Sequence, residues 1–133
     1  MISHTTLGSN NLSNADAFYS SWLPELHAKK IYQSEQVIFW EFYGGGAKLA
    51  ISKPYDGEPA SNGNGTMLAL QADSVQTVDK IYHLAIDAGA NCEGKPGDRN
   101  PGSFYGAYFR DLDGNKLAVF FRVPPPTDIK VKT

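Results

Sequence analysis

The sequence predicts an α+β fold in which two βαβββ modules surround a shared cavity. The chain has 133 residues, enough for one ordinary domain of roughly 100 to 150 residues but too few for two. Asp and Tyr recur at a spacing of 63 residues, as Asp16 with Asp79 and Tyr19 with Tyr82. Each pair lies in a segment of helical periodicity that follows a strand-like segment, so the chain reads as a degenerate internal repeat.

The first half opens with an alternating, β-branched segment, which predicts a strand. Ser13 and Asp16 have the spacing of a capping box and precede apolar residues at helical spacing. A helix is therefore expected over residues 15–23, ending before Pro24, which cannot donate to a helical ladder. A loop rich in Pro, Gly, Asn and Ser closes this half at residues 54–65. The strands expected here cover residues 2–7, 29–33, 37–43 and 48–53.

The second half repeats this order. Residues 73–76 form a second possible capping box, which predicts a helix over residues 74–88 with Gly89 as its left-handed terminator. The strands expected here cover residues 66–71, 91–94, 104–110 and 116–121, with an Asp-Gly turn before the last. The single domain is then residues 1–122, with its halves at about residues 1–56 and 63–122 and a Pro-rich tail at residues 123–133.

Composition narrows the class of protein. Twelve basic and fourteen acidic residues give a net charge of −2 without long runs of either sign, so neither nucleic acid nor a membrane is expected as a partner. No apolar run approaches the length of a membrane span, and the N-terminus lacks the features of a signal peptide, so a cytoplasmic location is expected. The single cysteine, Cys92, excludes an intramolecular disulfide. It is expected to be a small packed side chain rather than a nucleophile.

A family resemblance rests on the order of these elements together with three local features: His4 in the first strand, the Phe18-Tyr19 pair in the first helix, and Asp-x-Asp-Gly-Asn at residues 111–115. This combination resembles the vicinal oxygen chelate superfamily, and most closely its glyoxalase/bleomycin-resistance/dioxygenase group. The resemblance covers nearly the whole chain. It implies a glyoxalase-like fold around a ligand cavity, and relatives of this size often pair as dimers, so a homodimer is expected.

The resemblance also implies where a metal ion would bind. Relatives that perform chemistry hold a divalent ion with side chains from the first and last strands of each half, and the matching positions here are His4, Ala50, Met67 and Ala118. Of these, only His4 carries a donor suited to a hard or borderline divalent ion, since alanine has none and a thioether favours soft metals. A catalytic zinc ion needs about three protein ligands. We therefore expect no metal ion and no other cofactor.

Strand alternation predicts which side chains line the cavity. If His4 points inward, so does Thr6, two residues further along the strand. The same alternation, applied to the matching strands of each half, gives the other inward-pointing positions. Because relatives have an arginine and aromatic residues near the cavity mouth, Arg99 and Tyr105 are added as residues that would grip an anionic or planar ligand, or else form a surface ion pair. The predicted ligand-binding residues are His4, Thr6, Ala50, Ser52, Met67, Gln71, Arg99, Tyr105, Ala118 and Phe120. The face on which Phe39 and Glu41 lie is left open.

These residues favour a protein that binds a small organic molecule and has lost the metal site of its relatives. One alternative is a lyase or dioxygenase with an atypical metal centre, or a metal-free catalyst that uses His4 as a general base. Another is a structural protein in which Met67 and Phe120 fill the cavity as ordinary core, with His4 a hydrogen-bonded structural residue.

Overall fold

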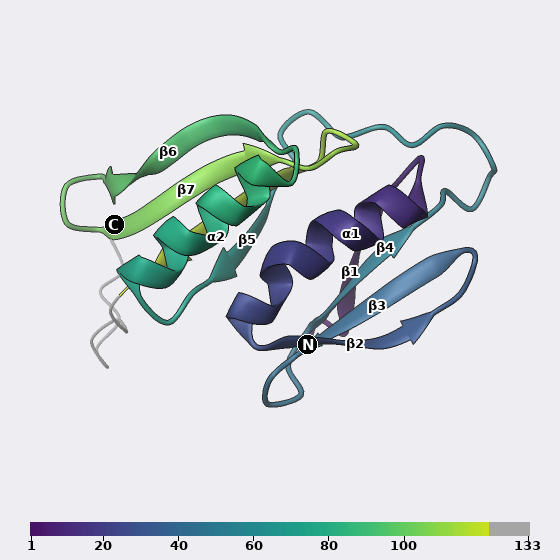
Figure 1. The fold of residues 1–133 in the computed structure, drawn as a ribbon, viewed down its shortest axis with the longest axis horizontal. Helices are drawn as coiled ribbons and strands as arrows, with labels where there is room; N and C mark the ends of the chain where they lie inside the picture. Colours follow the sequence, from purple (N-terminus) through teal and green to yellow (C-terminus); the bar gives the residue numbers. More distant parts are fainter. Residues whose placement is uncertain (123–133) are drawn as a thin grey trace, which may run out of the picture.

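A computed structural model describes residues 1–122 of the chain, and the Pro-rich tail at residues 123–133 lies outside the described residues. It confirms two βαβββ modules (Figure 1). Strands β7 and β8 have the predicted bounds, and the other predicted elements except β6 lie within three residues of theirs, whereas the 3-10 helix η1 was not predicted. In chain order the elements are β1 (His4–Gly8), α1 (Leu12–Trp22), the 3-10 helix η1 (Leu23–Leu26), β2 (Ala28–Gln33), β3 (Val37–Phe42), β4 (Lys48–Ser52), β5 (Leu68–Gln71), α2 (Val75–Asp87), β6 (Asn91–Arg99), β7 (Phe104–Arg110) and β8 (Lys116–Phe121).

Each module forms a four-stranded sheet, in the order β1-β4-β3-β2 and β5-β8-β7-β6. The first and last strands of each module run parallel, and the other neighbours are antiparallel. Thr6 pairs with Ala50 in the first sheet, and Ala69 pairs with Ala118 in the second. In the repeat, Thr6 corresponds to Ala69 and Ala50 corresponds to Ala118. The two sheets therefore have the same register at these positions, which confirms the internal repeat.

The first helix begins earlier than predicted. Its N-cap is Asn11, whose backbone is extended and whose side chain accepts a hydrogen bond of 2.9 Å from the backbone N–H of Asn14. The capping box predicted at Ser13 is therefore wrong, because asparagine caps a helix as well as serine does and Asn11 comes first. In the second half, Ser74 caps α2 by accepting from the N–H of Thr77 at 3.1 Å.

The sixth strand is longer than the predicted residues 91–94, because β6 continues to Arg99 through Pro96 and two glycines. A proline is tolerated here because β6 lies at the edge of its sheet and pairs only with β7. The register shifts twice along this pair, between Cys92 and Gly94 and between Gly94 and Gly97. Cys92 is exposed, so the prediction that it is packed was wrong.

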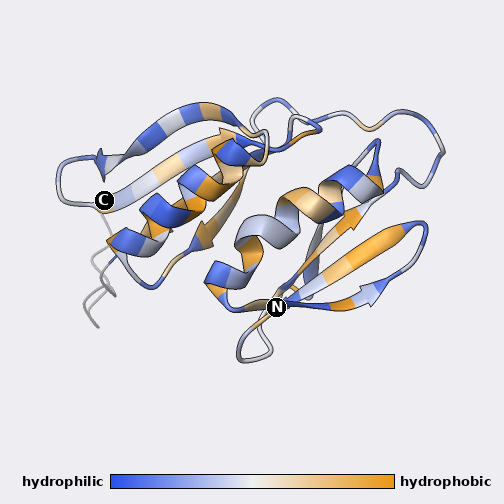
Figure 2. Ribbon diagram, in the orientation of Figure 1, coloured by the Kyte–Doolittle hydropathy of each residue, from blue (hydrophilic) through white to orange (hydrophobic). Residues whose placement is uncertain are grey.

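The core lies between the helices and one face of each sheet. Both helices lie on the same side of the molecule, in front of the sheets (Figure 1). Hydrophobic and hydrophilic residues alternate along α2 (Figure 2), as expected for a helix with one buried face. The two halves share one core, in which Trp22 of α1 meets Phe109 of β7 edge-on at 5.5 Å between ring centres. Among residues 1–122, no helix covers the opposite face of either sheet.

A buried polar cluster also joins the halves. The hydroxyl of Tyr19 in α1 donates to Asp111 at 2.5 Å, and the Asp111 carboxylate also accepts from the Asn115 side chain and from the backbone N–H groups of Asp113 and Asn115, each at 2.9 Å. The Asn115 side chain donates in addition to the carbonyl of Gly8, at 2.9 Å. The predicted Asp-Gly turn is therefore also a contact between the modules.

Candidate functional site

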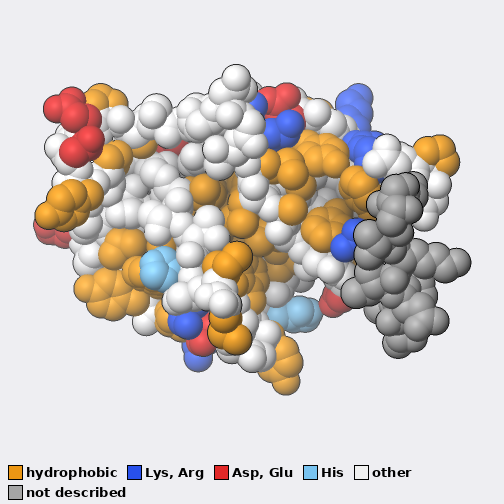
Figure 3. Space-filling model, turned by 180° about the vertical axis from the view of Figure 1, so that it is seen from behind, with side chains coloured by type: hydrophobic (Ala, Val, Ile, Leu, Met, Phe, Trp, Pro, Cys, Tyr) orange, Lys and Arg blue, Asp and Glu red, His pale blue; other side chains and the backbone are white. Residues whose placement is uncertain are grey.

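The helix-free face of each sheet is where a ligand can reach the fold. In the first sheet, Leu7 and Ile51 point into the core, so the alternating residues Thr6, Ala50 and Ser52 point to the open face. Seen from the side opposite the helices, hydrophobic side chains gather across the middle of the molecule (Figure 3). This distribution is unusual for a face exposed to water and is typical of a binding surface.

A hollow of about 570 Å³ lies on the open face of the first sheet. Its floor is formed by strands β1, β3 and β4, and its outer wall is the segment of residues 54–61, which we call the strap. We call this space the first-sheet hollow. The residues that line it are Thr6, Gly8, Gln36, Val37, Phe39, Ala50, Ser52, Lys53, Pro54, Tyr55, Asp56, Pro59, Ala60 and Ser61.

The polar groups around this hollow differ in how far they are already occupied. The Ser52 hydroxyl lies 2.8 Å from the carbonyl of Lys53 and 3.2 Å from that of Gln36, so it is engaged with backbone. By contrast, neither the Lys53 ammonium nor the Asp56 carboxylate takes part in an ion pair among the described residues. The Asp56 carboxylate does accept from the backbone N–H of Glu58 at 2.9 Å. The hollow therefore presents an apolar floor with one charge of each sign at its rim, neither of them in an ion pair among the described residues.

His4 lies on the open face of the first sheet, as predicted, but outside the first-sheet hollow. Its ring packs edge-on against Phe39 at 5.4 Å between centres, and its Nδ1 lies 3.1 Å from the Ser3 hydroxyl. Phe39 therefore shares the face of His4, whereas Trp40, which is 4% exposed, points into the core. This contact decides the strand parity that the sequence left open, and it places Glu41 on the open face.

The donor set does not fit a divalent metal ion. Among residues 1–122, no three His, Cys, Asp or Glu side chains lie close enough together to hold one. In the sheet His4 pairs with Lys48, whose ammonium cannot act as a second ligand while it is charged. Ala50 and Ala118, which are 1% and 4% exposed, have no donor atom in their side chains.

The structure does not bring the ten predicted residues together in one hollow. Thr6, Ala50 and Ser52 line the first-sheet hollow. Ala118 and Phe120 belong to the second sheet and Met67 comes just before its strand β5, and none of the three lines that hollow. Gln71 lines a separate hollow of about 520 Å³ between the halves, and its side chain donates to the carbonyl of Arg122 at 3.3 Å. Strand alternation predicts on which face of its sheet a side chain lies. It contains no information on how the faces of the two sheets are oriented relative to each other.

Tyr105 must be removed from the predicted site. Its side chain lies on the helix-covered face of the second sheet, where its hydroxyl donates to Asp79 of α2 at 2.5 Å. This hydrogen bond, with burial and the Asp79 charge, raises the pKa of Tyr105 above its ordinary value. Alternation along β7 puts Tyr108 on the opposite, open face.

Arg99 lies beside Tyr108 on that open face, rather than beside the predicted Tyr105. The guanidinium carbon is 5.5 Å from the centre of the Tyr108 ring, and the ammonium of Lys116 is 5.6 Å from the same centre. The Arg99 guanidinium also donates to the carbonyl of Lys95. Two cations therefore lie within cation–π distance of one aromatic ring. In the sequence, alternation along this strand places Tyr108 on the same face as Phe104, and this pattern could have identified Tyr108 as the aromatic neighbour of Arg99.

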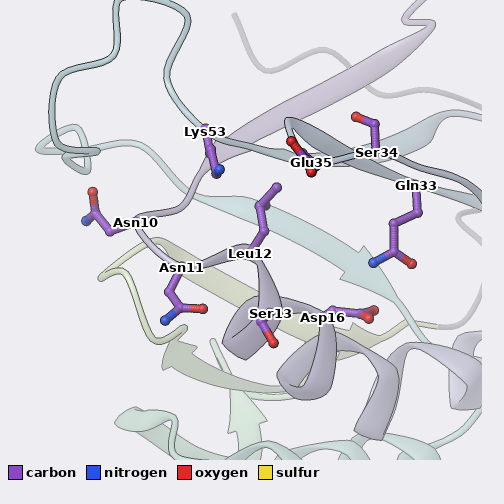
Figure 4. Close-up of a pocket in the computed structure, with 9 residues that line it drawn as sticks. All are labelled: Asn10, Asn11, Leu12, Ser13, Asp16, Gln33, Ser34, Glu35 and Lys53. Atoms are coloured by element: carbon purple, nitrogen blue, oxygen red, sulfur yellow. The ribbon is translucent and has the colours of Figure 1, made fainter.

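Another hollow, of about 750 Å³, lies at the start of α1 and is lined mostly by polar residues. Figure 4 shows its side chains spread around an open space rather than converging on one point. Several are already engaged: Asn11 caps α1, while Asp16 and Gln33 both bond Lys30. This hollow is therefore a less suitable binding site than the first-sheet hollow. Its lining residues are Asn10, Asn11, Leu12, Ser13, Asp16, Gln33, Ser34, Glu35 and Lys53.

Comparison with known proteins identifies the family. The sequence profile of the Glyoxalase/Bleomycin resistance protein/Dioxygenase superfamily matches residues 1–119. This chain therefore belongs to that superfamily, which confirms the resemblance inferred from the sequence. None of the curated proteins is significantly similar to it. No helix of the described residues is long and apolar enough to cross a membrane.

Solved structures share the fold over most of their length. A glyoxalase/bleomycin resistance protein from Albidiferax ferrireducens T118 is 32% identical, with a TM-score of 0.83, and the match covers 92% of this chain and 99% of that one. A glyoxalase-related enzyme from Fulvimarina pelagi is 20% identical, with a TM-score of 0.76 and coverage of 100% and 97%. The fosfomycin resistance protein FosX from Listeria monocytogenes, solved with Mn(II) and sulfate, is 20% identical, with a TM-score of 0.71 and coverage of 92% and 90%.

Proposed function

We propose that this chain is a small-molecule-binding member of its superfamily that acts without a divalent metal ion. The observation that carries the proposal is the first-sheet hollow of about 570 Å³. Its volume falls within the roughly 300–1,000 Å³ of typical small-ligand sites, and its mixture of an apolar floor with a few polar groups suits a largely apolar organic molecule. The absence of a metal donor set around His4 in residues 1–122 supports the metal-free part of the proposal.

We propose in addition that the protein works as a homodimer. The open face of the second sheet leaves Met67 44% exposed. Ala69, also exposed, and the half-buried Phe120 lie on the same face. A second copy packed on this face would remove that apolar surface from water, which favours association. Light scattering on the purified protein should then give twice the mass of one chain.

A thermal-shift screen tests the binding proposal. A ligand at about 100 times its Kd adds about 2.7 kcal/mol to the free energy of unfolding, which for a chain of this size raises the Tm by roughly 10 °C. Thr6→Trp should abolish the shift caused by any ligand of the first-sheet hollow, because Thr6 is exposed there and the indole would fill the space. Ser103→Trp, at an exposed loop position away from the hollow, should leave the shift unchanged.

Metal analysis tests the other half of the proposal. Protein dialysed against nickel, zinc, manganese or iron should not retain a stoichiometric ion, since one imidazole alone makes a weak, exchangeable site. About one tightly held ion per chain that is lost in His4→Ala would contradict the metal-free proposal. A ligand whose shift survives Thr6→Trp would instead place the binding site elsewhere on the chain.

A further inference from the structure

The strap that walls the first-sheet hollow is attached to the fold at very few points. From Tyr55 to Met67 every residue is exposed except Ala60. Open space lies on both sides of the strap, since a second hollow of about 340 Å³, lined by Asn10, Gln36 and strap residues, lies next to the first. Its starting end is held where the Gln36 side chain donates to the carbonyl of Lys53 at 2.8 Å. A segment with so few contacts needs a specific anchor to keep one position.

Asn10 provides that anchor. Its side-chain oxygen accepts from the backbone N–H of Ala60 at 2.7 Å, and its side-chain nitrogen donates to the carbonyl of Ala60 at 3.3 Å. One carboxamide therefore makes both hydrogen bonds that a neighbouring strand would make to this residue. The backbone N–H of Asn10 donates to Asp113 at 2.8 Å, which fixes the anchor to the second half of the chain.

Gly8 allows the strap to come this close. A Cβ atom at Gly8 would lie 3.1 Å from the Cβ of Ala60, a tighter approach than ordinary van der Waals contact. Gly8 and Ala60 both line the first-sheet hollow, so their contact closes it where the strap meets β1. The small side chains at both positions let the strap approach β1, and the Asn10 carboxamide holds the strap at the same residue, Ala60.

We propose that Asn10 is a latch that holds the strap as the outer wall of the first-sheet hollow, and that release of this latch opens the hollow to ligand. The gating role rests on the proposed binding function, whereas the latch itself rests on the contacts at Ala60. Asn10 is a positioning residue, because it acts on the hollow through Ala60 rather than by lining the hollow itself. A neutral hydrogen bond ordinarily changes an opening equilibrium by a few-fold to tenfold. Loss of the two bonds should therefore raise the population of the open strap by about tenfold.

Limited proteolysis of the full chain with pancreatic elastase, which cleaves after small residues, tests the latch. The rate at which a fragment ending at Ala60 appears, followed by mass spectrometry, should rise about tenfold in Asn10→Ala. Asn10→Asp should also accelerate it, because a carboxylate keeps the shape but turns the donor to the Ala60 carbonyl into an acceptor. Asn14→Ala, at a nearby exposed position whose side chain makes no hydrogen bond among the described residues, is the matched control and should cleave at the wild-type rate.

Gly8→Val releases the strap by a separate route, since its side chain meets Ala60 while Asn10 is intact. It should accelerate the same cleavage. A wild-type cleavage rate in Asn10→Ala would overturn the latch, and a faster rate in Gly8→Val alone would assign the hold on the strap to the contact between Gly8 and Ala60.

Dissociation of 8-anilinonaphthalene-1-sulfonate, measured by stopped-flow fluorescence, tests the gate, and it should be several-fold faster in Asn10→Ala than in Asn14→Ala. Equal rates would overturn the gating role. If the dye does not bind the wild-type protein, the binding function fails, while the cleavage rates still decide the latch.

Discussion

Trp22→Ala should lower the free energy of unfolding by roughly 3 to 5 kcal/mol, the largest effect expected of a single change in this chain. Trp22 is fully buried and packs against the rings of Phe18, Tyr19 and Phe109. Its removal leaves a cavity at the point where α1 meets the second sheet. Because Phe109 belongs to the other half of the chain, both modules should lose stability together, as one cooperative transition in urea.

Trp22→Phe should cost much less, about 1 kcal/mol or below. The indole Nε1 of Trp22 has no hydrogen-bond partner among the described residues, so its replacement also removes a buried polar group that is not satisfied. This gain offsets part of the cavity that the smaller ring leaves. Equal costs for Trp22→Phe and Trp22→Ala in urea denaturation would show that the Nε1 group is satisfied in solution.

Asp111→Ala should be the next most severe change, with a loss of roughly 3 kcal/mol or more. The carboxylate is 3% exposed and accepts from Tyr19, Asp113 and Asn115. Each buried donor left without its acceptor costs about 1 to 3 kcal/mol. Tyr19→Phe removes one bond and leaves the others, so it should cost about 1 to 2 kcal/mol. Glu35→Ala, at an exposed position, is the control and should change the stability little.

The same cluster predicts a dependence on alkaline pH. Burial, followed by the Asp111 charge and hydrogen bond, raises the pKa of Tyr19 well above its ordinary value. Its contribution to stability is complete below the pKa of an unfolded tyrosine and is lost as the pH rises toward the folded pKa. Tyr19→Phe should therefore reduce the loss of stability at high pH, measured by urea denaturation at a series of pH values. An unchanged pH profile would assign the loss to other groups.

The sequence alone determined the fold class, the module repeat and the strands β7 and β8, because these depend on local periodicity. It also determined that Ala50, Met67 and Ala118 carry no side-chain donor suited to a hard or borderline divalent ion, because the chemistry of a side chain does not depend on the fold. The face of each strand residue followed from alternation once a single contact, His4 with Phe39, fixed the parity of β3.

Only the tertiary structure decided which of the predicted site residues share a hollow. Alternation assigned Thr6 and Ala50 correctly to one open face, but it could not place the strap over that face or remove Tyr105 to the helix side. The same holds for Asn10, whose role depends on Ala60, a residue fifty positions away. Contacts of this kind are set by how the modules and the long loop pack together, and packing between distant segments leaves no periodic pattern in the sequence.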